Sequence, residues 1–117
     1  MNDYFEYLPL TQAMFHILLS LLDGDKHGYA IKKEIESISN QTINLGPGAL
    51  YGSINKLCDL QFITEVKKID DDPGEHSRQN RRYYSITPSG KKVLNAELDR
   101  LNKALVIARQ KKKYSHP

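Results

Sequence analysis

The segment NLGPGALYGSINKLCDL, residues 44–60, predicts the helix around which the rest of the chain is organised. Pro47 suits a first helical turn, because its φ angle is already helical and its missing N–H would have no partner there. Leu50, Ile54 and Leu57 follow at steps of four and three residues, which predicts one apolar stripe. The opposite face carries small or hydrogen-bonding side chains and no acid: Ala49, Tyr51, Gly52, Ser53, Asn55 and Lys56.

A helix with these two faces fits the DNA major groove, which admits one helix and offers donors and acceptors on its base edges. The Asn55 amide suits an adenine edge, although a solvated asparagine is the alternative. Tyr51 and Lys56 are better suited to phosphate. An ordinary amphipathic surface helix shows the same pattern, so the rest of the chain has to decide.

Composition is that of one small domain of 117 residues. Its single cysteine, Cys58, excludes an intrachain disulfide and fits a reducing cytoplasm; a buried thiol is the plain interpretation and a redox switch the alternative. We expect neither a secretory signal nor a membrane span. Through Leu60 four basic residues accompany seven acids, and after it thirteen basic residues accompany seven acids. This asymmetry favours a polyanionic partner.

Two further helices are predicted ahead of the first segment. Residues 12–22 form the central buried helix, with Thr11 as its N-cap, and residues 28–39 form an amphipathic second helix. Three helices with short connections match the helix-turn-helix pattern.

A β-hairpin follows, with predicted strands at residues 61–69 and 81–86 joined by a polar loop. Helices followed by a hairpin give the order of a winged helix. Acids in the loop (Asp70, Asp71, Asp72 and Glu75) favour a loop tip that points away from DNA. Five cations of this hairpin could reach phosphates: Lys67, Lys68, Arg78, Arg81 and Arg82.

Thr87 and Pro88 begin a last helix that is predicted to run to about Gln110. Its heptad seam needs a partner to bury it, which predicts a homodimer; the alternative is that the helix folds back on its own domain. The aromatic N-terminal arm, with Phe5 and Tyr7, is expected at the same interface. The seam residues are Leu94, Leu98, Leu101, Leu105 and Ala108.

The predicted fold class is mainly α with a small β-hairpin, a winged helix-turn-helix plus a long C-terminal dimerisation helix. We expect a winged-helix DNA-binding domain with an N-terminal arm at residues 1–86, the dimerisation helix at 87–110 and a basic tail at 111–117.

The chain resembles the PadR family of bacterial transcriptional regulators in three segments: LTQAMFHILLSLLDGDKHGYAIKKEIE, LGPGALYGSINKL and RRYYSITPSGKKVL. The resemblance implies a cytoplasmic winged-helix homodimer that occupies a palindromic operator in double-stranded DNA as a repressor. A small-molecule or stress signal would release it. The third helix, including Gly48 and Ala49, would enter the major groove with Tyr51, Ser53 and Asn55 nearest the bases or backbone. Phosphate contacts would come from Tyr29, Lys33 and Lys56.

Some family members hold flat drugs between tryptophans at the dimer interface, and this chain has no tryptophan. An apolar effector cavity would instead be lined by Tyr4, Phe5, Tyr7 and Phe15. No cofactor is expected, the histidines show no metal-ligand spacing, and no nucleophile–base pair indicates an enzyme. Two rivals stay open: a winged-helix protein-interaction module that does not bind DNA, and a small-molecule-binding or enzymatic dimer.

Overall fold

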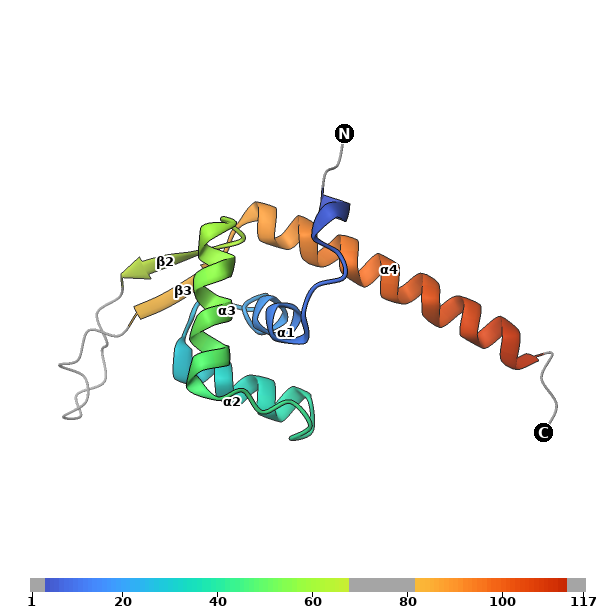
Figure 1. Cartoon of the computed structure of the whole chain (residues 1–117), viewed down its shortest axis with the longest axis horizontal. Coiled ribbons are helices and arrows are strands. Elements are labelled where there is room, and N and C mark those ends of the chain that lie inside the picture. Colours follow the sequence, from blue (N-terminus) through green and yellow to red (C-terminus); the bar gives the residue numbers. More distant parts are fainter. Residues whose placement is uncertain (1–3, 68–81, 114–117) are drawn as a thin grey trace.

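The computed structural model describes residues 4–67 and 82–113 (Figure 1). The chain begins with a short 3-10 helix, η1 (Tyr4–Tyr7), and continues through α1 (Gln12–Ser20), β1 (Lys26–His27) and α2 (Gly28–Ile38). Then come α3 (Pro47–Asp59), β2 (Ile63–Lys67), β3 (Arg82–Ile86) and the long α4 (Pro88–Lys113). The predicted class is confirmed: mainly helical, with a small sheet and a long C-terminal helix.

The core is built around α1, whose Ile17 and Leu18 are fully buried. Thr11 caps this helix as predicted, because its Oγ1 accepts a hydrogen bond of 3.1 Å from the Met14 N–H. The apolar stripe of α3 packs into the same core, which confirms the prediction for its inner face. Buried members of the core from the other elements are Ile31, Ile35, Leu50, Ile54, Leu57, Phe62, Ile63, Tyr84, Val93 and Leu94.

The sheet has three antiparallel strands in the order β1-β3-β2. The hairpin of β2 and β3 was predicted, and β2 begins two residues later than expected, whereas β1 was not predicted. β1 has only two residues, Lys26 and His27, which pair with Tyr84 and Tyr83 of β3. A pair of polar residues carries no alternating pattern, so sequence periodicity could not have revealed this strand. Lys68, Arg78, Arg81 and the loop acids lie outside the described residues.

The sheet meets α4 at a tight joint. The Thr87 hydroxyl donates a 2.7 Å hydrogen bond to the carbonyl oxygen of Gln61 and also accepts one from the Gly90 N–H. A Cβ atom at Gly90 would lie 2.0 Å from the Phe62 carbonyl oxygen, so only glycine allows this approach. The turn at residues 87–90 therefore fixes the direction in which α4 leaves the sheet.

α4 has two halves with different surroundings. Val93 and Leu94 have no exposed surface, because they pack in the core of their own subunit, whereas Leu101 and Leu105 are 40% and 46% exposed. The assignment of Leu94 to a dimer interface was therefore wrong: α1 and the core already cover it. Leu98 is half-buried at the boundary, and Ala108 is exposed. The helix also continues three residues past its predicted end at Gln110.

The second half of α4 projects away from the rest of the molecule (Figure 1). The radius of gyration is 17.0 Å, whereas a compact chain of this length would have a value of about 13 Å. Within residues 4–67 and 82–113, no helix is both long enough and apolar enough to cross a membrane.

Candidate nucleic-acid interface

The outward face of α3 is the first part of the candidate interface. Gly46 caps the helix without a side-chain hydrogen bond, and Pro47 occupies its first turn. Ser53 is half-buried, and the other predicted contact residues of this helix are exposed: Gly48, Ala49, Tyr51, Asn55 and Lys56. The observed helix also includes Asp59, which is exposed one turn beyond Asn55. The outward face is thus free of acids only as far as Cys58, which favours its N-terminal half as the part that approaches bases.

On α2, Tyr29 and Lys33 lie together on the surface. The Lys33 ammonium lies 5.4 Å from the centre of the Tyr29 ring, a cation–π arrangement, and Tyr29 is 61% exposed. Lys33 also lies 3.8 Å from Glu36, which receives a 2.6 Å hydrogen bond from Lys32 that lowers the pKa of its carboxyl group. Because Glu36 offsets part of its charge, Lys33 is a weaker candidate for phosphate binding than Lys56.

The hairpin adds a pair of cations. Lys67 on β2 lies directly opposite Arg82 on β3, and both side chains are exposed. Like charges at opposite positions of two strands destabilise a hairpin. The acid near this pair among the described residues is Glu65, whose carboxylate lies 3.9 Å from the Arg82 Nε. A bound polyanion would remove the repulsion between the two cations.

These elements meet at one groove of about 520 Å³, which we call the α2–α3–β3 groove. The structure brings four of the predicted contact residues together around it: Tyr29 from α2, Tyr51 and Asn55 from α3, and Arg82 from β3. Lys33 and Lys56 lie on the same two helices. The remaining lining residues are His27, Gly28 and Tyr84.

Three of the lining residues were missed by sequence reasoning. His27 is the N-cap of α2: its Nδ1 accepts from the Ala30 N–H at 3.2 Å, and its ring meets the Tyr83 ring edge-on at 5.3 Å. Histidine is not among the usual N-cap residues, so no sequence pattern indicated this role. Tyr84 follows Tyr83 on β3, so the two side chains point to opposite faces of the strand, and Tyr84 is the buried member. Burial raises the pKa of its phenol.

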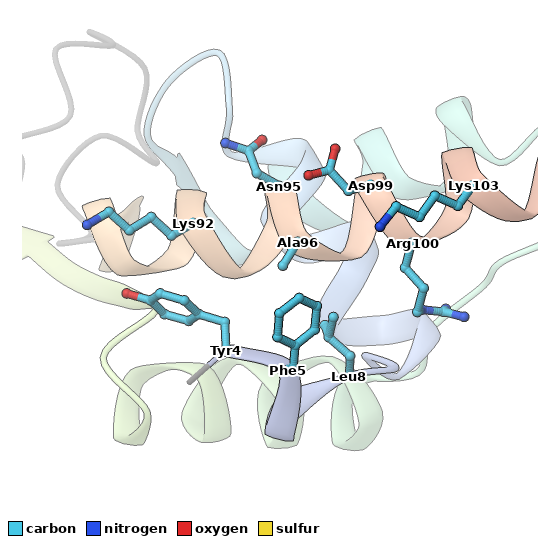
Figure 2. Close-up of a pocket in the computed structure, with 9 residues that line it drawn as sticks. All are labelled: Tyr4, Phe5, Leu8, Lys92, Asn95, Ala96, Asp99, Arg100 and Lys103. Carbon is cyan, nitrogen blue, oxygen red and sulfur yellow. The ribbon is translucent and has the colours of Figure 1, made fainter. Parts of the chain in front are cut away.

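The predicted effector residues do not share one cavity. Tyr4 and Phe5 line a groove of about 880 Å³ between the N-terminal arm and α4, the arm–α4 groove, where Phe5 faces Ala96 (Figure 2). Tyr7 instead packs edge-on against Phe62, and Phe15 packs against His16. The groove is also less apolar than expected, because α4 contributes charged and polar side chains: Lys92, Asn95, Asp99, Arg100 and Lys103.

Cys58 is half-buried, and burial raises the pKa of its thiol above the ordinary value. This environment disfavours the thiolate that a redox switch requires and agrees with the plain interpretation. Within the described parts of the chain, no three histidine, cysteine, aspartate or glutamate residues are grouped to hold a metal ion.

A family model described as the transcriptional regulator PadR-like family matches residues 17–96. The chain belongs to the PadR-like family of transcriptional regulators. The match begins within α1 and ends within the buried part of α4, so it includes both helices of the interface, α2 and α3, and both strands of the hairpin.

Solved structures share the PadR-like fold. A PadR family transcription regulator of Clostridium difficile superposes with a TM-score of 0.70 at 20% identity, covering 86% of this chain and 97% of that one. A structure of Bacillus subtilis PadR in complex with operator DNA has a TM-score of 0.61 at 27% identity, covering 73% of this chain and 45% of that one.

Relatives in sequence include proteins of different lengths. A 37.1 kDa protein of a Streptomyces fradiae transposon is 38% identical over 87 residues, which is 74% of this PadR-like chain but only 22% of that protein. Protein X of Lysinibacillus sphaericus is 30% identical over 79 residues, 68% of each chain. This chain therefore spans about a fifth of the length of the Streptomyces relative.

Proposed function

We propose that this PadR-like chain is a cytoplasmic, sequence-specific DNA-binding regulator that represses transcription as a homodimer on a palindromic operator. The observation that carries the proposal is the α2–α3–β3 groove. Hydrogen-bonding side chains from two helices and a cation from the hairpin converge there, beside the outward face of α3. The operator complex of Bacillus subtilis PadR is further support, since that protein has a similar fold.

In this proposal, each part of the interface has a role. The N-terminal half of α3 enters the major groove, with Asn55 and Ser53 nearest the base edges. Tyr29, Tyr51 and Arg82 hold the phosphate backbone at the side of the helix, and Lys67 extends this contact along the hairpin. Lys56 adds charge on the exposed face of α3. In a dimer the two α3 helices should lie about one DNA turn apart, roughly 34 Å.

Dimerisation is proposed through the second half of α4 and the arm. The described part of this half has apolar side chains that are 40–51% exposed: Leu101, Leu105, Val106 and Ile107. Phe5 on the arm is 68% exposed. Helices with such surfaces bury them against a partner. The arm–α4 groove lies beside this surface, so an effector bound there could alter the spacing of the two α3 helices and release the operator.

Salt dependence of DNA binding tests the proposal. Fluorescence anisotropy of a labelled duplex from upstream of the protein's own gene, measured from 50 to 300 mM salt, should give a steep negative slope of log affinity against log salt. Lys56→Ala should weaken binding to every duplex and flatten this slope by about one unit. Lys92→Ala, which removes the same charge at the arm–α4 groove, is the matched control and should change neither the DNA affinity nor the salt slope.

A winged-helix protein-interaction module is the rival function. This rival predicts weak DNA binding with little dependence on salt. It also predicts equal DNA affinities and equal salt slopes for the Lys56→Ala and Lys92→Ala variants. Either result would reject the DNA-binding proposal.

A further inference from the structure

Gly28 and Tyr51 are in contact across the α2–α3–β3 groove. Gly28 is the first residue of α2 and is buried, and Tyr51 comes from the second turn of α3. A Cβ atom at Gly28 would lie 2.3 Å from the Tyr51 hydroxyl oxygen and 2.8 Å from the ring carbon that carries it. Real Cβ atoms do not approach other atoms so closely. The missing side chain of Gly28 is therefore what lets the Tyr51 hydroxyl lie against the start of α2.

The φ angle of Gly28 is not the reason for a glycine at this position. Among the described glycines only Gly24 has a positive φ, so α2 could begin with any L-residue as far as its backbone is concerned. Gly46, Gly48 and Gly52 have no neighbouring atom within 4 Å of an added Cβ. Gly28 thus differs from the glycines of α3 in being needed for a side-chain contact.

The position of the Tyr51 hydroxyl matters because of its neighbours. Tyr51 is 45% exposed and lines the groove, and its hydroxyl group lies against the start of α2. Tyr29, Asn55 and Arg82 line the same groove from three different elements. A hydroxyl, an amide and a guanidinium around one groove are the groups that proteins use to bind a phosphate of duplex DNA.

We propose that Gly28 is a positioning residue for DNA binding, which acts by leaving room for Tyr51 to bind a backbone phosphate from the α2–α3–β3 groove. This inference rests on the proposed DNA-binding function and deepens it. Tyr51 touches the DNA, and Gly28 acts only through Tyr51. An alanine at position 28 would push the end of the Tyr51 side chain outward. That displacement costs little folding stability, because the end of a flexible side chain can move, but it removes the hydroxyl from the phosphate.

A double-mutant cycle tests this coupling. Gly28→Ala and Tyr51→Phe should each weaken binding of the labelled duplex about tenfold, the loss expected for one hydrogen bond to a charged group. The Gly28→Ala/Tyr51→Phe double variant should lose about tenfold as well, and not about a hundredfold, because both changes remove the same contact.

The salt slope gives a second readout, which separates the loss of a neutral contact from the loss of a cationic one. A neutral hydroxyl releases no counterion when it binds phosphate, so both single variants should keep the slope of the wild type, whereas Arg82→Ala should flatten it by about one unit. Gly52→Ala is the stability control, because alanine is also the better helix former there but meets no neighbouring atom. Thermal unfolding should give Gly28→Ala a melting temperature close to that of Gly52→Ala.

Two results would overturn the inference: wild-type DNA affinity of Gly28→Ala, or losses that multiply in the double variant. If Gly28→Ala does not fold, the Gly28→Ala/Tyr51→Ala variant, in which the clash is absent, replaces it in the test. This double variant should bind DNA with the same affinity as Tyr51→Ala. A lower affinity than that of Tyr51→Ala would overturn the inference. Failure of the wild type to bind any duplex would instead reject the proposed function.

Discussion

Glu97 shows how one buried charge holds the N-terminal arm in place. Its carboxylate is 2% exposed, accepts a 2.8 Å hydrogen bond from the Leu10 N–H and pairs with Arg100 at 2.5 Å. The hydrogen bond from Arg100 is the largest cause of the lowered pKa of Glu97, which outweighs burial. Sequence alone could not assign this role, because a glutamate on a helix is most often solvated and its partner lies 87 residues away.

The pH dependence of stability should report this interaction. The folded-state pKa of Glu97 is lowered, so its contribution to stability is complete above the unfolded value of about 4.3 and is lost as pH falls through the folded value. Glu97→Gln should therefore be less stable than the wild type at pH 7, by about 1–2 kcal/mol. The difference in unfolding free energy should shrink as pH falls below about 4.3.

Chemical denaturation at pH 3 to 7 measures this difference, with Asp99→Asn as the matched control. Asp99 lies on the same helix but is exposed, so its substitution should leave the pH profile unchanged. A constant difference between the wild type and Glu97→Gln across the pH range would contradict the assigned role of the charge.

At the scale of secondary structure, strong periodicity was sufficient to predict the main elements. The three helices of the domain and the strands of the hairpin follow from apolar spacing, from the N-cap Thr11 and from the first-turn residue Pro47. β1 could not be predicted, because a strand of two residues shows no periodicity. The end of α4 was placed too early, because its last residues are basic helix formers with no stop signal. For the candidate site, side-chain chemistry identified Tyr51, Asn55 and Arg82, and the family resemblance added Tyr29. Only the fold placed these four residues around one groove.

The two facing cations of the hairpin should lower folding stability and strengthen DNA binding. Lys67 lies opposite Arg82, so Lys67→Gln removes a repulsion of about 0.2–1 kcal/mol and should leave the fold as stable as the wild type or slightly more stable. The same change should weaken DNA binding and flatten the salt slope by about one unit. Denaturation and anisotropy measure the two effects separately.

Glu65 provides the control of opposite sign for this hairpin. Glu65→Gln removes the acid that lies 3.9 Å from Arg82, so it should strengthen DNA binding and leave a steeper slope. A Lys67→Gln variant with the slope of the wild type would show that the hairpin does not reach the phosphate backbone.

At the scale of the whole molecule, one face of α4 has two different surroundings. Val93 and Leu94 are buried in their own domain, and the stripe that contains Leu94 continues into the projecting half, where Leu101 and Leu105 are exposed. Sequence periodicity identifies which face of a helix is apolar but not what covers it. This is why Leu94 was assigned to the interface together with Leu101 and Leu105, although only the latter two are available to a partner.

Leu101→Asp should separate a dimer into monomers without unfolding either one. Leu101 is already 40% exposed in the subunit, so the substitution should change monomer stability by less than about 0.5 kcal/mol, whereas it places a charge in the centre of the proposed interface. Sedimentation should then show a monomer, and operator affinity should fall sharply because one α3 helix alone reads only half a palindrome. Asn102→Asp puts the same charge on the neighbouring exposed position and should remain dimeric. A dimeric Leu101→Asp variant that binds operator as the wild type does would place the interface elsewhere on the molecule.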